Sequence, residues 1–408
     1  MIRFFVCYLE SNILTLTKMR LNFIIPLSIA VAITLGGCQG NQKKVAIKVD
    51  TTDNWAILPF TKLDSVNPVL GPGRGNFIDP ILKTKVLWES KDVFNPAIVN
   101  RGGKIWMLYR AQDSTGKPAG TSRIGLAVST DATHFVRKPT PVLYPDKDDY
   151  QKLEWQGGCE DPRVVEDGHG TYYMTYTAFD GTTARLLIAT STDLINWKKH
   201  GSVFAKADSG KYAGKWSKSG SIVSTYKKSG KVIATKINGK YWMYWGDTQI
   251  WTATSTDLIN WTPVKMQAGE KPPVKLRSQA LNMPELKIAL PTREGKFDSD
   301  LVESGPPAIL TDRGIVLIYN SRNVPSFGDK MLAEGTYTAS QALFDKNDPT
   351  KLIKRLDHYF MKPEKPYERS GQVNQVCFVE GLAIFDNHWY LYYGTADSKI
   401  AVAVSPVK

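Results

Sequence analysis

The chain has 408 residues, a formal net charge of +13 and an aromatic content of 11%. This length would allow two or three ordinary domains, but closed all-β folds often run longer as one domain. The lysines are scattered along the chain, which favours a solvated basic surface over a nucleic-acid partner, and the five histidines show no ligand spacing, so we expect no metal.

The N-terminal segment has the order of a bacterial export signal. After Met19, a possible true start, come an arginine, the apolar stretch 21–35 and a Leu-Gly-Gly-Cys box that ends at Cys38. The pattern resembles a lipoprotein signal, in which Cys38 is lipidated; an ordinary secretory signal or a membrane anchor is the alternative. We therefore expect a signal peptide over 1–38, a linker over 39–64 and a protein held outside the cytoplasm, with the lipid as its only membrane contact.

The rest of the chain, 65–408, carries one short pattern that returns along the sequence. A turn residue precedes a run of aromatic and apolar residues, and successive turn residues lie about 70 positions apart. These turn residues are Gly103, Gly170, Gly239, Gly314 and Asn387. A regular period of this kind indicates an array of equivalent units.

Each unit is expected to form a four-stranded antiparallel sheet, because short β-branched and aromatic runs alternate with clusters of Gly, Asn, Asp and Ser. Such sheets arranged around an axis make a β-propeller, which leaves only short, protected strand edges. We therefore predict an all-β, five-bladed β-propeller over 65–408. A long β-sandwich is the alternative, but it would not need the same turn chemistry at a fixed interval.

Two cysteines remain once Cys7 and Cys38 are assigned to the leader. Cys159 and Cys377 both precede predicted inner strands and could be neighbours near the axis. A single pair is no disulfide framework, and the sequence leaves open whether the two thiols pair.

The starts of the innermost strands of a propeller gather at one mouth of its central channel. The predicted inner strands place a polar residue directly ahead of apolar ones, and these residues are Asn95, Asp161, Glu303 and Glu380. Glu160 precedes Asp161 and should point to the opposite side, because strand residues alternate faces. For Glu380, capping a turn or pairing with an arginine is an equally open role.

Carboxylates crowded at one mouth cannot all ionise freely. One tends to keep its proton and can act as a general acid, while another stays ionised as a base. A pair of carboxyl groups across a sugar ring is the usual equipment for cleaving a glycosidic bond. The sequence therefore favours an enzyme that acts on an oligosaccharide.

A set of local motifs is spread over about residues 65–405. They include Phe94-Asn95-Pro96, Leu108-Tyr109-Arg110-Ala111, Ser122-Arg123-Ile124, Gly158-Cys159-Glu160-Asp161-Pro162-Arg163, Gly305-Pro306-Pro307 and Tyr392-Tyr393-Gly394-Thr395-Ala396-Asp397. In combination these motifs resemble glycoside hydrolase family 130. The resemblance implies a five-bladed propeller that acts on β-mannosides, as a phosphorylase or as a hydrolase.

The resemblance also implies roles for single residues. Asp161 matches the general acid, which in the phosphorylases passes its proton through a substrate hydroxyl, and Glu303 resembles the base of the β-1,2-mannosidases. Asn95, Arg110 and Asp397 match positions that hold the sugar at the cleavage point. The expected substrate-binding residues are Asn95, Arg110, Arg123, Arg163, Arg185, Lys240, Glu380 and Asp397.

The two reactions of the family differ in what attacks the sugar. Phosphate needs a cluster of cations, which Arg185 and Lys240 could help to supply, whereas water needs a carboxylate base. The histidine that the phosphorylases carry near the turn of the third repeat is missing from 257–261. Glu303 and the expected export favour an inverting β-mannoside hydrolase that needs no cofactor. A phosphorylase with inorganic phosphate as co-substrate and a non-catalytic sugar-binding propeller are the alternatives, and substrate linkage and oligomeric state stay open.

Overall fold

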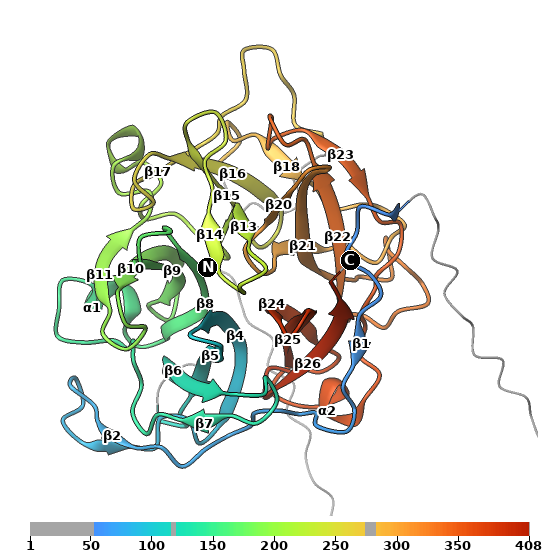
Figure 1. The fold of residues 1–408 in the computed structure, drawn as a ribbon. Coiled ribbons are helices and arrows are strands. Elements are labelled where there is room, and N and C mark those ends of the chain that lie inside the picture. Colours follow the sequence, from blue (N-terminus) through green and yellow to red (C-terminus); the bar gives the residue numbers. More distant parts are fainter. Residues whose placement is uncertain (1–52, 116–119, 274–282, 408) are drawn as a thin grey trace, which may run out of the picture. The chain divides into compact units, whose positions relative to one another are not determined.

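Strands make up nearly all of the regular structure (Figure 1). The computed structural model describes residues 53–115, 120–273 and 283–407. The helices within these ranges are α1 (Gln151–Glu154), α2 (Pro366–Arg369) and the 3-10 helix η2 (Ala207–Gly210). No helix in the described ranges is long and apolar enough to cross a membrane. The all-β prediction is confirmed, whereas the expected signal peptide with its Cys38 lies outside the described residues.

Each repeat of the sequence forms antiparallel strands that follow one another along the chain. The first two repeats contain β4 (Asp92–Arg101), β5 (Lys104–Gln112), β6 (Ser122–Ser129) and β7 (Val136–Arg137), then β8 (Gly158–Glu166), β9 (Tyr172–Phe179), β10 (Ala184–Ser191) and β11 (Lys198–Ser202). The third contains β12 (Ser221–Ile222), β15 (Tyr241–Trp245), β16 (Ile250–Ser255) and β17 (Trp261–Pro263), with β18 (Ile288–Leu290) added to β16.

The later repeats continue the same plan. They contain β19 (Leu301–Ser304), β20 (Ile309–Thr311), β21 (Gly314–Arg322), β22 (Tyr337–Phe344) and β23 (Leu352–Arg355), then β24 (Cys377–Phe385), β25 (His388–Thr395) and β26 (Lys399–Pro406). Two hairpins stand outside this plan: β2 (Phe77–Ile78) with β3 (Lys85–Val86), and β13 (Ser224–Tyr226) with β14 (Val232–Ala234). The predicted aromatic runs are β5, β9, β15, β21 and β25, so the strand after each turn residue is confirmed.

The sheets are grouped around a common centre, with β4, β8 and β24 close to it (Figure 1). Strand β4 contacts both β8 and β24, and β8 also contacts β24, although these strands are far apart in sequence. The hairpin β13–β14 bridges neighbouring sheets, because β14 pairs in parallel with β8 and β13 pairs in parallel with β20. This radial arrangement brings the starts of several inner strands together.

The two ends of the described chain share one sheet. Strand β1 (Thr61–Lys62) pairs antiparallel with β26, with Thr61 opposite Val404. Trp55, just before β1, is buried in the core beside the last repeat. The expected linker 39–64 therefore extends too far, since at least residues 55–62 belong to the folded unit. Adding an N-terminal strand to the last sheet covers an edge that would otherwise be open.

A buried tyrosine–carboxylate–lysine contact recurs in two sheets and fixes the segment before the inner strand. Glu154 of α1 accepts hydrogen bonds from Tyr176 at 2.8 Å and Lys199 at 2.6 Å. Glu368 of α2 accepts them in the same way, from Tyr393 at 2.8 Å and from Lys62 at 2.8 Å. Breaking a buried pair of this kind by removing one partner is strongly destabilising.

The two cysteines that the sequence left open are both free and buried. Cys159 packs with the core between the first two repeats, whereas Cys377 packs with the core of the last repeat. The expectation that they are neighbours near the axis is wrong, because each lies at the outset of its own inner strand and faces a different sheet interface.

Candidate active site

Three polar residues near the starts of inner strands have a strained backbone conformation. Asn95, Asp161 and Ser219 have φ values of 47°, 48° and 59°, which non-glycine residues rarely adopt. The register of β4 with β5 and of β8 with β9 shifts at the first two of these residues. A β-bulge turns a side chain out of strict alternation, and strain that the surrounding sheet maintains often marks a functional site. In the first two repeats a bulge with a positive φ thus turns Asn95 and Asp161 out of the strand alternation, and Ser219 in the third repeat shares the positive φ.

The glycine at the start of β8 is required by its surroundings. Gly158 has φ 110°, and a Cβ there would lie 2.1 Å from the carbonyl oxygen of Ser122 on β6. Because only glycine fits, β8 can approach β6 closely and start directly ahead of the bulge. The Gly-Cys-Glu-Asp-Pro-Arg motif thus provides a close contact between strands as well as two acidic residues of the site.

Glu160 and Asp161 lie on the same side of β8. The Arg110 guanidinium donates to Glu160 Oε1 at 2.7 Å and to Asp161 Oδ1 at 3.0 Å. The prediction that Glu160 points to the opposite side is wrong, because the bulge at Asp161 interrupts the alternation on which it depended. Arg110 also lies over the Phe94 ring, 4.6 Å from its centroid, which fixes its orientation.

Asp161 is buried and is surrounded by positive charge and hydrogen-bond donors. Asn95 Nδ2 donates to its Oδ1 at 2.9 Å, and Lys218 Nζ lies 3.4 Å from its Oδ2. Burial by itself would raise the pKa of Asp161, but Arg110, Lys218 and the Asn95 hydrogen bond outweigh burial and hold this pKa well below its usual range. Asp161 is therefore ionised in the ligand-free protein.

Glu303 on β19 lies beside the same lysine. Lys218 Nζ is 3.9 Å from Glu303 Oε1, and the Ser219 hydroxyl donates a hydrogen bond to the same oxygen. Because Lys218 Nζ lies within 3.9 Å of both Asp161 Oδ2 and Glu303 Oε1, the two carboxyl groups are close to each other. Burial raises the pKa of Glu303 to about 7, against the charge of Lys218 and with a further contribution from Asp247.

These contacts partly correct the predicted proton positions. Burial raises the pKa of several carboxyl groups here, but of the two predicted catalytic acids Glu303 has the raised pKa, and the expected acid Asp161 has the lowered pKa. The reason is that the cations are distributed unevenly, since Arg110 and Lys218 both contact Asp161. No sequence pattern shows which of two buried acids lies nearer to two cations from other strands.

Glu380 on β24 is fully buried, and neither carboxylate oxygen accepts a hydrogen bond from a described residue. Burial raises its pKa well above the usual range, Asp161 and Glu303 add to this, and Arg163 opposes it. Arg163 Nη1 is 3.6 Å from Glu380, while its other nitrogens donate to the carbonyl oxygens of Gly305 and Ser304 at 2.7 Å each. Arg163 thus holds β8 against the fourth repeat, and its expected role in sugar binding stays a prediction.

Asp397 lies at the turn between β25 and β26 and is half-buried. Burial raises its pKa to about 6, and the charge of Arg110 opposes the rise. Together with the residues above it completes a group that we call the carboxylate cluster. The cluster consists of Glu160, Asp161, Glu303, Glu380 and Asp397.

Three residues expected to bind substrate lie elsewhere or are engaged by other groups. Arg123 is buried and donates to Asp79 and Asp113 at 2.6 and 2.5 Å. Arg185 donates to Asp180 at 2.7 Å. Lys240 is exposed at the start of β15, the end of that strand away from Lys218. The sequence does not reveal the partners of Arg123 and Arg185, because these aspartates lie in loops or turns outside the motifs.

Lys218 is the functional residue that sequence reasoning missed. Its carbonyl oxygen accepts the Gly246 N–H at 2.9 Å, and its ammonium lies between Asp161 and Glu303. The charges of both acids raise the pKa of Lys218 above its usual range, against the effect of burial. The signal was available, because Lys218 and Ser219 occupy in the third repeat the place that Asn95 and Asp161 occupy in the first two.

Comparisons with known proteins identify the family of the chain. A family model described as β-1,4-mannooligosaccharide phosphorylase, for glycoside hydrolase family 130, matches residues 81–408. The chain belongs to glycoside hydrolase family 130. The resemblance is thereby confirmed at the level of the family. In this family 130 chain, acid–base groups gather in the carboxylate cluster.

The curated relatives of this family 130 chain are named as phosphorylases of β-mannosides. A 1,2-β-oligomannan phosphorylase from Thermoanaerobacter sp. (strain X514) is 32% identical over 340 residues, which are 81% of this chain and 95% of the relative. A glycosyl hydrolase structure from Bacteroides ovatus is 47% identical, with a TM-score of 0.80, covering 86% of this chain and 94% of the other.

A further solved structure bears directly on the reaction. It is 46% identical, with a TM-score of 0.81, and covers 87% of this chain and 96% of the other. It is described by the statement that the GH130 family of mannoside phosphorylases contains glycoside hydrolases that target β-1,2-mannosidic linkages in Candida mannan. Family 130 therefore includes both reactions that the sequence left as alternatives.

Proposed function

We propose that this protein is a five-bladed propeller enzyme that cleaves β-mannosides by inverting hydrolysis at the carboxylate cluster. The observation that carries the proposal is the position of Lys218 within 3.4 Å of Asp161 and 3.9 Å of Glu303. Two carboxyl groups that share one ammonium can act on the same glycosidic bond from different sides. Inverting enzymes need roughly 6.5–9.5 Å between the two carboxyl groups to leave room for water.

Asp161 is the proton donor in this proposal. Because its pKa is lowered in the ligand-free protein, substrate binding has to raise this pKa before Asp161 can carry a proton. Sugar hydroxyls that bind to Asn95, Arg110 and Lys218 compete with Asp161 for these groups. As the compensating contacts weaken, the effect of burial on the carboxyl prevails and its pKa rises, so it can take up the proton of the pair. Glu303, left ionised, activates the attacking water as a general base.

The charge of the cluster favours water as the acceptor. Among the described residues, five carboxyl groups face Arg110, Lys218 and Arg163, and each of these cations already contacts at least one carboxylate. A phosphate dianion would need cations that are free to form charge-assisted hydrogen bonds. It would also meet the negative charge of the neighbouring acids, whereas water meets a base with a pKa of about 7.

Phosphorolysis is the second candidate, and the names of the curated relatives favour it. The relatives at 32% and 30% identity are a 1,2-β-oligomannan phosphorylase and a β-1,2-mannobiose phosphorylase, both from Thermoanaerobacter sp. (strain X514). In this alternative, phosphate displaces carboxylates from Lys218 or Arg110 and attacks the sugar in place of water. Both candidates share the β-mannoside, the proton donor and the cluster.

Product analysis decides between the two acceptors. Incubation with β-1,2-mannobiose in phosphate-free buffer is expected to release free mannose at the same rate as in 10 mM phosphate, on the order of the 1–10³ s⁻¹ typical of enzymes. Chromatography of the products distinguishes mannose from mannose 1-phosphate. Turnover that depends on phosphate and yields mannose 1-phosphate would establish the second candidate instead.

The pH dependence follows from the shifted pKa values. An acid–base pair works with one proton between its two members, and pairs of this kind titrate as a unit. Since the pKa of Asp161 is lowered and that of Glu303 is about 7, the pair carries one proton below pH 7 and loses it above. We expect kcat/KM to be flat at mildly acidic pH and to fall about tenfold per pH unit well above 7.

Stopped assays from pH 4 to pH 9 measure this profile, with Asp397→Asn as the matched control. Asp397 has its own raised pKa of about 6, so a fall that persists in this variant belongs to the pair. A rate that instead increases as pH rises through 7 would mean that only an ionised base is needed, and Asp161 would not be the donor.

A further inference from the structure

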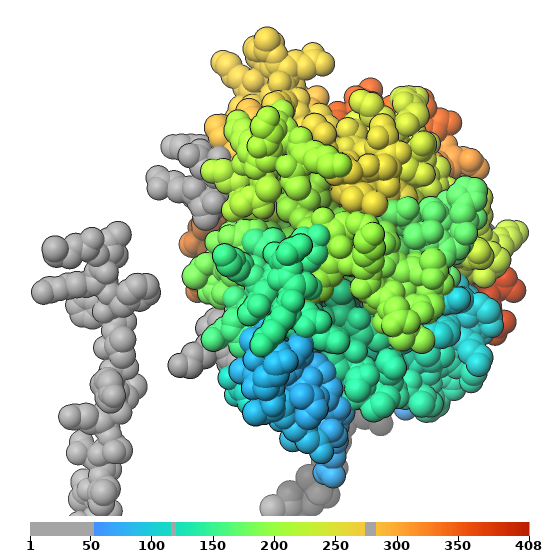
Figure 2. Space-filling model, turned by 90° about the vertical axis from the view of Figure 1, so that its left-hand side faces the viewer, coloured from blue at the N-terminus to red at the C-terminus, as the bar shows by residue number. Residues whose placement is uncertain are grey.

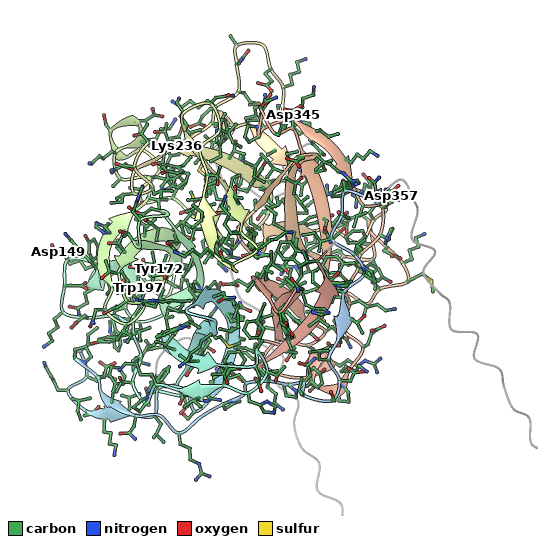
Figure 3. All side chains as sticks on the ribbon, in the orientation of Figure 1. Asp149, Tyr172, Trp197, Lys236, Asp345 and Asp357 are labelled. Carbon is green, nitrogen blue, oxygen red and sulfur yellow. The ribbon has the colours of Figure 1, made fainter. Side chains whose placement is uncertain are left out.

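A hollow of about 580 Å³ lies on the outer edge of the protein, between the segment after β7 and the end of the second repeat. We call it the outer groove; its lining includes Thr140, Tyr144, Tyr150, Asn196 and Trp197. Figure 2 shows the face formed by this part of the chain, in green, and Figure 3 shows Trp197 at the same edge as Asp149. The residues of the carboxylate cluster do not line it.

Two identical turns in the chain differ in what covers their tryptophan. The sequence Leu-Ile-Asn-Trp occurs at 194–197 and at 258–261, and in both turns the indole N–H donates to the leucine carbonyl oxygen, at 3.1 and 3.0 Å. Trp261 is 1% exposed in the core of the third repeat, whereas Trp197 is half-buried. The same local structure thus leaves one aromatic face open to the outer groove.

The cover over Trp261 is more complete than the cover over Trp197, which packs against the core between the first two repeats but stays half-buried. The segment after β11 carries Phe204 and Tyr212, and both pack with Trp261 in one core cluster. The segment that borders Trp197 runs from Lys138 to Tyr150 and leaves the hollow between them. Trp197 therefore keeps an exposed aromatic surface, whereas the identical turn has its tryptophan, Trp261, buried.

The polar groups of the outer groove balance in charge. Lys199 is fully engaged by the Tyr144 carbonyl oxygen, Asp148 and Glu154, at 2.8, 2.9 and 2.6 Å. The other two charged groups that line the hollow, Lys138 and Asp146, have opposite charges, so their charges cancel. A groove without net charge gives no attraction for a polyanion or an anionic lipid surface.

The groove is also unsuited to an apolar partner. None of its lining residues is among the exposed large hydrophobic residues of the described chain. Tyrosine and tryptophan combine an apolar ring with a polar tip, and pockets of roughly 300–1,000 Å³ lined in this way suit small polar ligands. An aromatic face flanked by hydroxyl, amide and carboxylate groups matches the alternating CH and OH surfaces of a pyranose.

We propose that the outer groove is a second carbohydrate-binding site, which takes a neutral oligosaccharide against Trp197 and holds long substrate chains near the enzyme. The class of sugar, a β-mannan, rests on the proposed function, whereas the presence of a second site does not. The Asn196 side-chain amide donates a hydrogen bond to Asp193 Oδ2 at 2.7 Å, which leaves its carbonyl oxygen to accept a hydrogen bond from a sugar hydroxyl.

The test uses the full-length protein with Asp161→Asn, which is expected to slow turnover by roughly 10²–10⁴-fold, and a soluble β-1,2-mannan oligosaccharide of six units as the probe. Isothermal titration calorimetry is expected to show two sites per chain. Adding Trp197→Ala should leave one site, with the second weakened by roughly tenfold or more through loss of the aromatic contact. Trp106→Ala is the matched control, because Trp106 is also half-buried and donates its indole N–H to a carbonyl oxygen, that of Arg101.

A second variant guards against a folding defect in Trp197→Ala. Asn196 is exposed, so Asn196→Arg should fill the hollow without disturbing the core, and it should remove the same site. One site in the parent protein, two sites in both groove variants, or an equal loss in Trp106→Ala would overturn the proposal. Turnover of β-1,2-mannobiose by the enzyme with Asp161 intact is measured separately: its absence would refute the proposed function, whereas the number of binding sites would still decide the groove.

Discussion

Asp161→Asn is expected to lower kcat on β-1,2-mannobiose by roughly 10²–10⁴-fold, the usual contribution of general acid catalysis. Asparagine keeps the size of the side chain and can still meet Asn95 and Arg110, but it cannot transfer a proton. The loss should therefore appear in the chemical step rather than in folding. Steady-state kinetics with the purified variant measure it, and the midpoint of thermal unfolding serves as the folding control.

The leaving group separates a proton donor from a residue that only organises the site. A β-mannoside of an acidic phenol needs little protonation as it departs, so Asp161→Asn should lose far less activity on this substrate than on mannobiose. Equal losses on the two substrates would remove Asp161 from the role of donor. If the unmodified protein turns over neither substrate, the sugar-binding propeller becomes the better account.

Glu303→Gln is expected to lower hydrolysis by a similar roughly 10²–10⁴-fold, because the amide cannot accept a proton from water. The hydrogen bond from Ser219 can still be accepted by the amide oxygen, so the local packing should persist. Removing the carboxyl with a pKa of about 7 should also change the pH profile. The fall in kcat/KM above pH 7 should disappear in this variant.

Added azide tests whether Glu303 acts on the attacking water. Azide needs no base, so it should restore cleavage by Glu303→Gln and give the α-mannosyl azide that an inverting displacement predicts. Glu380→Gln is the matched comparison, because Glu380 is equally buried in the same cluster and is proposed to have no role as base. Rescue of Glu380→Gln but not of Glu303→Gln would move the base to Glu380.

The architecture was largely predictable, because it depends on local chemistry that repeats. The turn residues and the aromatic runs specify strands at regular intervals, and the strands occur where the runs predict them. The boundary at residue 64 was not predictable, since β1 is only two residues long and is defined by its partner β26 rather than by its own sequence. Short edge strands carry little pattern of their own.

The members of the site were only partly predictable. Asn95, Asp161, Glu303 and Glu380 occupy equivalent places in the repeats, so the closure of the sheets brings them together. Lys218 was missed, although Lys218 and Ser219 stand at the equivalent place in the third repeat, because its partners Asp161 and Glu303 come from other repeats.

The sequence by itself determined the all-β plan, the family and the acids available for catalysis, since each of these depends on residue identity and spacing along the chain. Only the tertiary structure decided which acid holds the proton. The pKa of Asp161 is lowered by Arg110 from the first repeat and Lys218 from the third, whereas at Glu303 burial outweighs the charges of Lys218 and Arg163 and gives a pKa of about 7. Electrostatic energies depend on distances of a few ångströms in a buried environment, and those distances exist only after the sheets have packed together.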